Sequence, residues 1–162
     1  MAKRTSAGTP ATVALTAAGI PFAVHAYEHD ASAPSFGLEA AEALGVEPER
    51  VFKTLLADTE AGLVVGVVPV DGRLDLKALA TAVGAKRAVM ADAAVAERRT
   101  GYVVGGISPI GQKTLLPTVI DETAELFDTV FVSGGRRGLD VELTPADLIA
   151  ATSATVAPIA RP

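Results

Sequence analysis

The spacing of apolar and polar residues along the chain predicts about seven short strands. Two strongly apolar runs, at 51–57 and 63–69, are joined by a polar turn and are typical of a β-hairpin. The second run is so continuously apolar that both of its faces are expected to be buried. Shorter apolar or alternating segments predict the other strands, at 22–26, 86–89, 118–121, 129–132 and 139–143.

Helices are predicted between these strands, where capping residues precede apolar residues at helical spacing. Thr9 before Pro10 and Thr144 before Pro145 each combine an N-cap with a proline at the first helical position. The predicted helices cover about 10–18, 38–44, 74–83, 92–98 and 146–151, with a brief helix or turn at 122–126.

The order of these elements lacks the regular strand–helix alternation of a doubly wound fold. It predicts one α/β (α+β) domain, with a mixed sheet or a closed barrel and flanking helices. We place this single domain on residues 1–162, with a core at about 9–152. The segments 1–9 and 156–162 are expected to be terminal tails.

Composition narrows the chemistry. The chain of 162 residues has no Cys and only two His, which excludes disulfides and thiolate catalysis and predicts no metal site. We expect no cofactor, because the sequence has neither a phosphate-binding P-loop nor a dinucleotide fingerprint. The N-terminus lacks the apolar core of a signal peptide, and no segment is apolar enough to span a membrane, so a cytoplasmic location is the default.

The net charge of −5 argues against a protein coated with basic residues for general nucleic-acid binding. Local basic pairs leave room for a restricted RNA contact, although each of these residues is more simply explained as part of a solvated rim. The pairs are Lys86 with Arg87, Arg98 with Arg99, and Arg136 with Arg137.

The segment 101–111 combines Val103 and Val104, which favour a short strand, with a loop rich in glycine. Gly105 and Gly106 permit backbone angles that a Cβ atom would forbid, and Pro109 stiffens the turn. A rigid loop with uncovered amides suits an anion or a carbonyl oxygen. Taken alone, the same pattern is better explained by a tight connection without a ligand.

Lys53 lies in the middle of an apolar predicted strand, where an ammonium group is costly unless it finds a partner. Its face of the strand also carries Leu55 and Ala57, so simple solvent exposure does not explain it well. It is therefore a candidate for binding a phosphate or carboxylate, or for polarising a carbonyl group. Ser133 and Asp140 belong to a second glycine-rich loop and the strand after it, and each is also explained by an ordinary turn or surface position.

A serine nucleophile needs an activating base, and no Gly-x-Ser-x-Gly motif or other motif links a histidine to Ser108 or Ser133. The residues alone therefore predict a small polar pocket with one lysine, glycine-loop amides and a carboxylate.

Five sequence blocks occur in order and with compatible spacing: VFKTL at 51–55, VPV at 68–70 with LDLK at 74–77, GYVVGGISPIGQK at 101–113, LPT at 116–118 and VSGGRRGL at 132–139. Together they resemble the YbaK-type Cys-tRNA(Pro) deacylases, which are related to the editing domain of bacterial prolyl-tRNA synthetases. The resemblance implies a single domain built on a mixed β-barrel with flanking helices. It implies catalytic roles for Lys53, Gly105, Gly106 and Asp140. It implies substrate binding by Tyr27, Phe36, Ser108, Pro109 and Ser133.

The resemblance also implies a reaction, the trans-editing of cysteine mischarged onto tRNA(Pro). The substrate's own thiol is expected to attack the aminoacyl ester, giving a thiolactone and free tRNA. The implied partners are aminoacylated tRNA(Pro) and prolyl-tRNA synthetase. Two alternatives stay open: removal of another amino acid such as alanine, and a non-catalytic relative that binds a nucleotide or small molecule, against which Lys53 argues.

Overall fold

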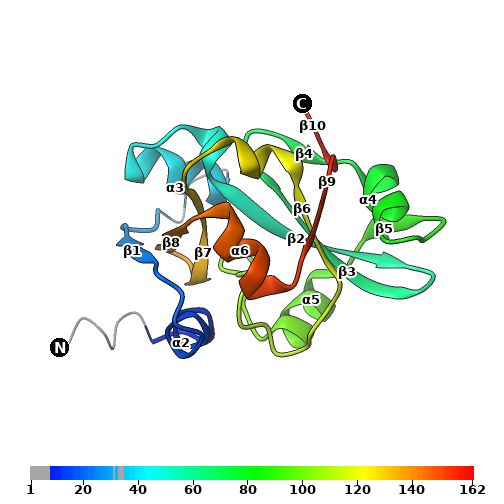
Figure 1. The fold of residues 1–162 in the computed structure, drawn as a ribbon, viewed down its shortest axis with the longest axis horizontal. Helices are drawn as coiled ribbons and strands as arrows, with labels where there is room; N and C mark the ends of the chain where they lie inside the picture. The colour runs from blue at the N-terminus through cyan, green and yellow to red at the C-terminus, as the bar shows by residue number, and fades with distance from the viewer. Residues whose placement is uncertain (1–7, 31, 33–34) are drawn as a thin grey trace.

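The computed structural model describes residues 8–30, 32 and 35–162. Ten strands lie in this part of the chain, and they form three sheets (Figure 1). Their bounds are β1 Ala23–Ala26, β2 Phe52–Thr59, β3 Gly62–Pro69, β4 Arg73–Leu74, β5 Ala88–Met90, β6 Thr118–Asp121, β7 Val130–Arg136, β8 Leu139–Leu143, β9 Thr155–Ala157 and β10 Ala160–Arg161.

Helices flank the sheets. The α-helices are α2 Pro10–Ala17, α3 Phe36–Leu44, α4 Leu76–Ala82, α5 Ala93–Thr100 and α6 Pro145–Thr152, and the 3-10 helices are η1 Pro48–Arg50 and η2 Glu122–Leu126. The predicted caps are confirmed: the side chains of Thr9 and Thr144 accept hydrogen bonds from amides in the first turns of α2 and α6.

The larger sheet has the order β5-β2-β3-β6-β9, with β2 and β3 antiparallel and β3, β6 and β9 parallel. The smaller sheet has the order β1-β8-β7, and a bridge between Val51 and Phe131 connects the start of β2 to β7. The predicted mixed α/β domain is therefore confirmed. A closed barrel is not, because the described strands form separate sheets of five, three and two strands.

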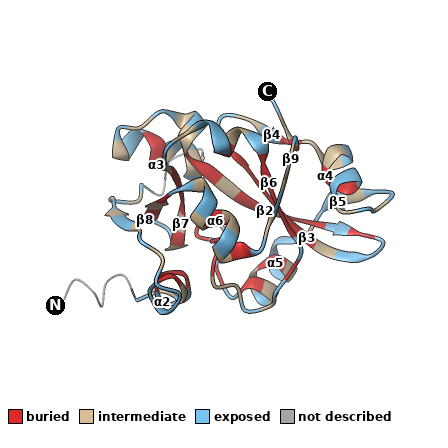
Figure 2. Ribbon diagram, in the orientation of Figure 1, coloured by how far each residue is buried: buried red, intermediate tan, exposed pale blue. Residues whose placement is uncertain are grey.

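The buried residues concentrate on β2, β3, β7 and β8 (Figure 2). The two faces of β2 contact different parts of the core, as the alternation of its side chains predicts. Phe52 and Leu56 pack into the main cluster with Val65 and Val67, whereas Ala57 packs with a second cluster around Leu79. Because both faces of β2 pack against the core, a charged group on this strand carries a desolvation cost.

Two predictions about local structure are wrong. The run around Val103 is not a strand, because the whole segment 101–117 consists of turns and irregular loop. The segment after residue 155 is not a tail, because β9 pairs with β6 and β10 pairs with β4. Asp121 holds this C-terminal segment by accepting hydrogen bonds from the amides of Ile159 and Ala160, both at 2.9 Å. The predicted frayed tail at 1–9 lies mostly outside the described residues.

Candidate active site

A cavity of about 420 Å³ lies between β2, α3, the 101–117 loop and the β7–β8 sheet. Many of its lining residues are apolar, and a few polar groups converge on it, as is usual for sites that take small molecules. Six of the nine site residues expected from the sequence line it: Tyr27, Phe36, Lys53, Gly105, Ser133 and Asp140.

Lys53 supplies the positive charge of the cavity from the start of β2. Its burial lowers the pKa of the ammonium group, and the negative charge of Asp71 partly offsets that effect. Among the described residues, no carboxylate forms an ion pair with Lys53 within 4.0 Å. Its hydrogen-bond donors are therefore available to a ligand in the cavity.

Asp140 supplies the carboxyl group from β8, the central strand of the smaller sheet. The strand register places it opposite His25 on one side and Ser133 on the other. The residue is only 4% exposed, and this burial raises the pKa of the carboxyl group from 3.8 to about 7. Asp140 can therefore change its protonation state near neutral pH, as groups in functional sites often do.

Tyr27 and Ser133 lie around this carboxyl group. Burial, together with the negative charge of Asp140, raises the pKa of Tyr27 to about 12, so its phenol stays protonated at neutral pH. The Ser133 hydroxyl accepts a hydrogen bond from the Gly135 amide at 3.1 Å, which leaves its own proton to donate. Both groups can thus donate hydrogen bonds in the cavity.

The glycine loop contributes Val104, Gly105 and Ile107 to the cavity, and Gly105 has a φ of 90°. No hydrogen bond donated by the Gly105 amide is found within the described part of the chain. Gly106 is different, because its amide donates to the Val103 carbonyl at 2.8 Å. A Cβ atom on Gly106 would lie 2.7 Å from Arg136 Cα, so this glycine allows the loop to pack against the β7–β8 turn.

Ser108 and Pro109 are buried and do not line the cavity. The Ser108 hydroxyl accepts a hydrogen bond from the Ile110 amide at 3.2 Å, and its carbonyl accepts one from Gln112. These contacts hold the loop in place on the side that faces away from the cavity. The substrate-binding roles expected of both residues stay predictions, and the structure places them as support for the wall that Gly105 forms.

Thr54 is a lining residue that the sequence reasoning missed. It is 8% exposed, and its Oγ1 atom is buried without a hydrogen-bond partner. Buried hydroxyl groups without a partner are rare because their desolvation is not compensated. The signal in the sequence was a threonine on the core-facing side of an apolar strand, next to Lys53.

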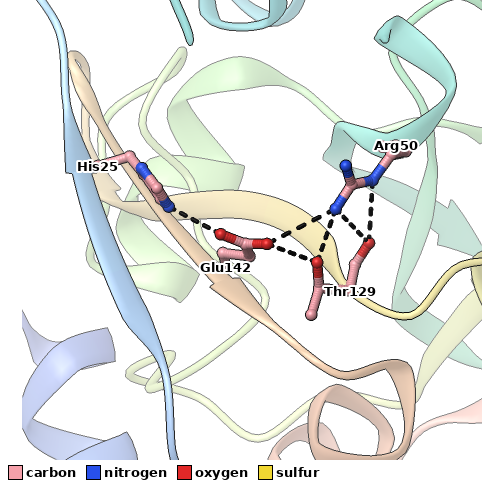
Figure 3. Close-up of polar contacts among 4 residues, drawn as sticks. All are labelled: His25, Arg50, Thr129 and Glu142. Carbon is pink, nitrogen blue, oxygen red and sulfur yellow. Dashed lines mark hydrogen bonds and ion pairs between the residues drawn. The ribbon is translucent and has the colours of Figure 1, made fainter. Parts of the chain in front are cut away.

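A polar network ties together the strands that carry Lys53 and Asp140 (Figure 3). Glu142, two residues after Asp140 on β8, contacts His25 on β1 at 2.9 Å and Arg50 of η1 at 3.5 Å. Arg50 also donates to the carbonyl of Thr129 at 3.2 Å, while the Thr129 hydroxyl donates to Glu142. Since η1 leads directly into β2, this network connects the two sheets.

Neither histidine lines the cavity, and no hydrogen bond joins a histidine to Ser108 or Ser133 in the described part of the chain. His25 contacts Glu142, and His29 contacts Glu39 through its Nδ1 atom at 2.9 Å. The described residues also contain no group of three or more metal-binding side chains that could hold an ion. None of the helices in the described part of the chain has the length and apolar character needed to cross a membrane.

The fold of this protein matches solved structures over most of its length. A structure described as a candidate trans-editing enzyme for prolyl-tRNA synthetase superposes with a TM-score of 0.83 at 30% identity, covering 94% of this chain and 96% of that one. The hypothetical protein APE2540 superposes with a TM-score of 0.84 at 28% identity, covering 94% and 99%. The shared fold is thus a single α/β domain associated with aminoacyl-tRNA editing.

The sequence comparisons define the family. The model of the aminoacyl-tRNA editing domain matches residues 23–151, and the chain belongs to this family. A candidate Cys-tRNA(Pro)/Cys-tRNA(Cys) deacylase, EbsC, from Enterococcus faecalis (strain ATCC 700802 / V583) is 42% identical over 120 residues, which cover 74% of this chain and 73% of that protein. The predicted resemblance to the YbaK-type deacylases is confirmed, and with it the prediction of an aminoacyl-tRNA deacylase.

Proposed function

We propose that this protein deacylates cysteine mischarged onto tRNA(Pro), with the cysteine thiol of the substrate as the nucleophile. Its family and the names of its relatives support the substrate class. The observation that carries the mechanism is the content of the cavity: a cation and a buried carboxyl group, without an activated nucleophile. The chain has no Cys, and neither histidine lines the cavity.

The proposed reaction balances without a protein nucleophile. The substrate's Sγ attacks its own carbonyl carbon, a C–S bond forms, and the ester C–O bond to the ribose breaks. The thiol proton passes to the ribose oxygen, which leaves as the hydroxyl of free tRNA, and the amino acid leaves as a thiolactone. The protein then supplies orientation and charge stabilisation, which together account for large accelerations in other enzymes.

The residues that line the cavity have separate roles in orienting the substrate and stabilising charge. Lys53 stabilises negative charge that develops on the ester, and the Gly105 amide donates to the carbonyl oxygen as it becomes an oxyanion. The ionised Asp140, with Ser133 beside it, binds the substrate's amino group or ribose hydroxyl. Phe36 and Tyr27 provide aromatic walls.

Binding of the tRNA body needs a positively charged surface, which this acidic protein does not provide by its overall charge. We propose that prolyl-tRNA synthetase supplies part of it, and that the work is done in the cytoplasm, where aminoacyl-tRNA is used. Local contacts can add to it: Glu60 accepts a hydrogen bond from the Arg87 amide at 3.2 Å and one from Lys86, which holds this basic pair on the surface near β5.

Thr54 is expected to contribute to the choice of amino acid. Replacing it with valine keeps its shape and removes a buried hydroxyl that has no partner in the protein. We expect thermal stability to stay equal or rise, and kcat/KM for Cys-tRNA(Pro) to fall up to about tenfold, because a hydrogen bond to the substrate is worth about 1 kcal/mol. Lower stability with unchanged turnover would show that the hydroxyl serves folding instead.

The second candidate substrate is Ala-tRNA(Pro), because a cavity that admits cysteine also admits the smaller alanine and rejects it only weakly. Incubation of the protein with Cys-, Ala- and Pro-charged tRNA(Pro), with and without prolyl-tRNA synthetase, separates the candidates. The proposal expects rapid release of cysteine and slow release of alanine and proline. Preferential release of alanine would replace the thiol mechanism, and no release of any amino acid would favour a non-catalytic binder.

A further inference from the structure

Arg137 joins two segments that line the cavity. Its guanidinium carbon lies 4.9 Å from the centroid of the Phe36 ring, the first residue of α3. Its Nε–H group donates to the carbonyl of Val104, in the glycine loop, at 2.9 Å. Phe36 and Val104 both line the cavity, so one side chain links two lining segments that are far apart in sequence.

The backbone around Arg137 is shaped for this contact. A Cβ atom on Gly105 would lie 2.8 Å from Arg137 Nε and 3.0 Å from both Cδ atoms of Phe36, so the two side chains can meet over the loop only at a glycine. The turn that carries Arg137 is itself anchored, because the Tyr27 amide donates to the Gly138 carbonyl at 2.9 Å. Arg137 is thus fixed at its backbone, through the anchored turn, and at its guanidinium group, through its contacts with Phe36 and Val104.

We propose that Arg137 is a positioning residue that fixes Phe36 against the glycine loop and so sets the shape of the cavity where these two segments meet. The inference rests on the proposed function, because its effect is read on the aminoacyl ester. This positioning role requires a planar guanidinium group, which covers an aromatic face while one N–H group points to a carbonyl. Lysine offers the same charge without this geometry.

The alternative role for Arg137 is an electrostatic contact to the RNA backbone, and the two roles predict different outcomes. If Arg137 positions Phe36, Arg137→Lys and Arg137→Gln both lower kcat about tenfold with little change in the salt dependence of binding. If Arg137 contacts phosphate, Arg137→Lys keeps activity close to that of the wild type. Arg137→Gln then weakens tRNA binding and reduces the slope of its dependence on salt concentration by about one. The second pattern would overturn the inference.

Arg73→Gln is the matched control, because Arg73 on β4 is exposed, lies outside the cavity and loses the same charge. A double-mutant cycle with Phe36→Leu adds a direct test: the inference expects Arg137→Gln to cost little once Phe36 is replaced, and additive losses would contradict it.

A second readout does not depend on turnover. The NMR shifts of the Phe36 ring protons are expected to move in Arg137→Lys and Arg137→Gln and to stay unchanged in Arg73→Gln. Unchanged ring shifts in both Arg137 variants would overturn the positioning role. Failure of the wild-type protein to release any amino acid, with the ring shifts moving as expected, would instead refute the proposed function and leave the contact established.

Discussion

Replacing Lys53 with alanine is expected to abolish deacylation of Cys-tRNA(Pro), with a loss of at least about a hundredfold in kcat. Lys53 is half-buried and is the one Lys or Arg among the described residues that line the cavity, so no other cation stands in for it there. Single-turnover kinetics with preformed Cys-tRNA(Pro) measure the loss at the chemical step.

The stability of the Lys53→Ala variant is expected to hold or to rise. The ammonium group is desolvated in the folded protein, as its lowered pKa indicates, and its removal relieves that cost. Lys77→Ala is the control, because Lys77 is exposed on α4 outside the cavity. Turnover close to the wild-type rate in a folded Lys53→Ala variant would remove Lys53 from the mechanism.

Replacing Asp140 with asparagine is expected to lower turnover by tenfold to a hundredfold, roughly the value of a hydrogen bond to a charged group. The wild-type rate should rise with pH through about 7 as the carboxyl group ionises, and the variant should lose this rise. A pH–rate profile of both proteins between pH 5 and 9 measures the difference. A persisting rise in the variant would assign the titration to another group.

Asp140 also predicts how stability depends on pH. Its pKa is higher in the folded protein, about 7, than its ordinary value of 3.8, so between these values the folded state binds the extra proton. The contribution of Asp140 to stability therefore falls as pH rises from about 4 to 7 and stays low above 7, by roughly 4 kcal/mol at most. Asp140→Asn removes this cost, so its Tm should exceed that of the wild type at pH 8 and approach it at pH 4.

The sequence predicted the site best where a residue conflicted with its local pattern. Lys53 interrupts an apolar strand, and the structure places it in the cavity wall as that conflict suggests. Tyr27 and Phe36 followed only from the family resemblance. Ser133 and Asp140 were weaker candidates before it, since each alone fits an ordinary turn or surface position. Capping residues and the helical spacing of apolar residues predicted most helices because both act locally.

Features that depend on distant contacts escaped the sequence. The sequence pattern gives Gly106 the same expected role as Gly105. Only the tertiary structure shows that the Gly106 amide donates a hydrogen bond within the loop and that the β7–β8 turn packs against this glycine. The C-terminal strands have little pattern of their own and are held by Asp121, far away in sequence. Thr54 was missed because a threonine in a strand is common, and only its unpartnered hydroxyl distinguishes it.

The central claim is that the substrate's thiol replaces a protein nucleophile. Cysteine and serine differ only in this atom, so the direct test compares the release of cysteine and of serine from the same tRNA(Pro), under single-turnover conditions with the wild-type protein. The account predicts that cysteine is released at least about a hundredfold faster, because a thiol is the far better nucleophile near neutral pH. Equal rates for the two amino acids would contradict it.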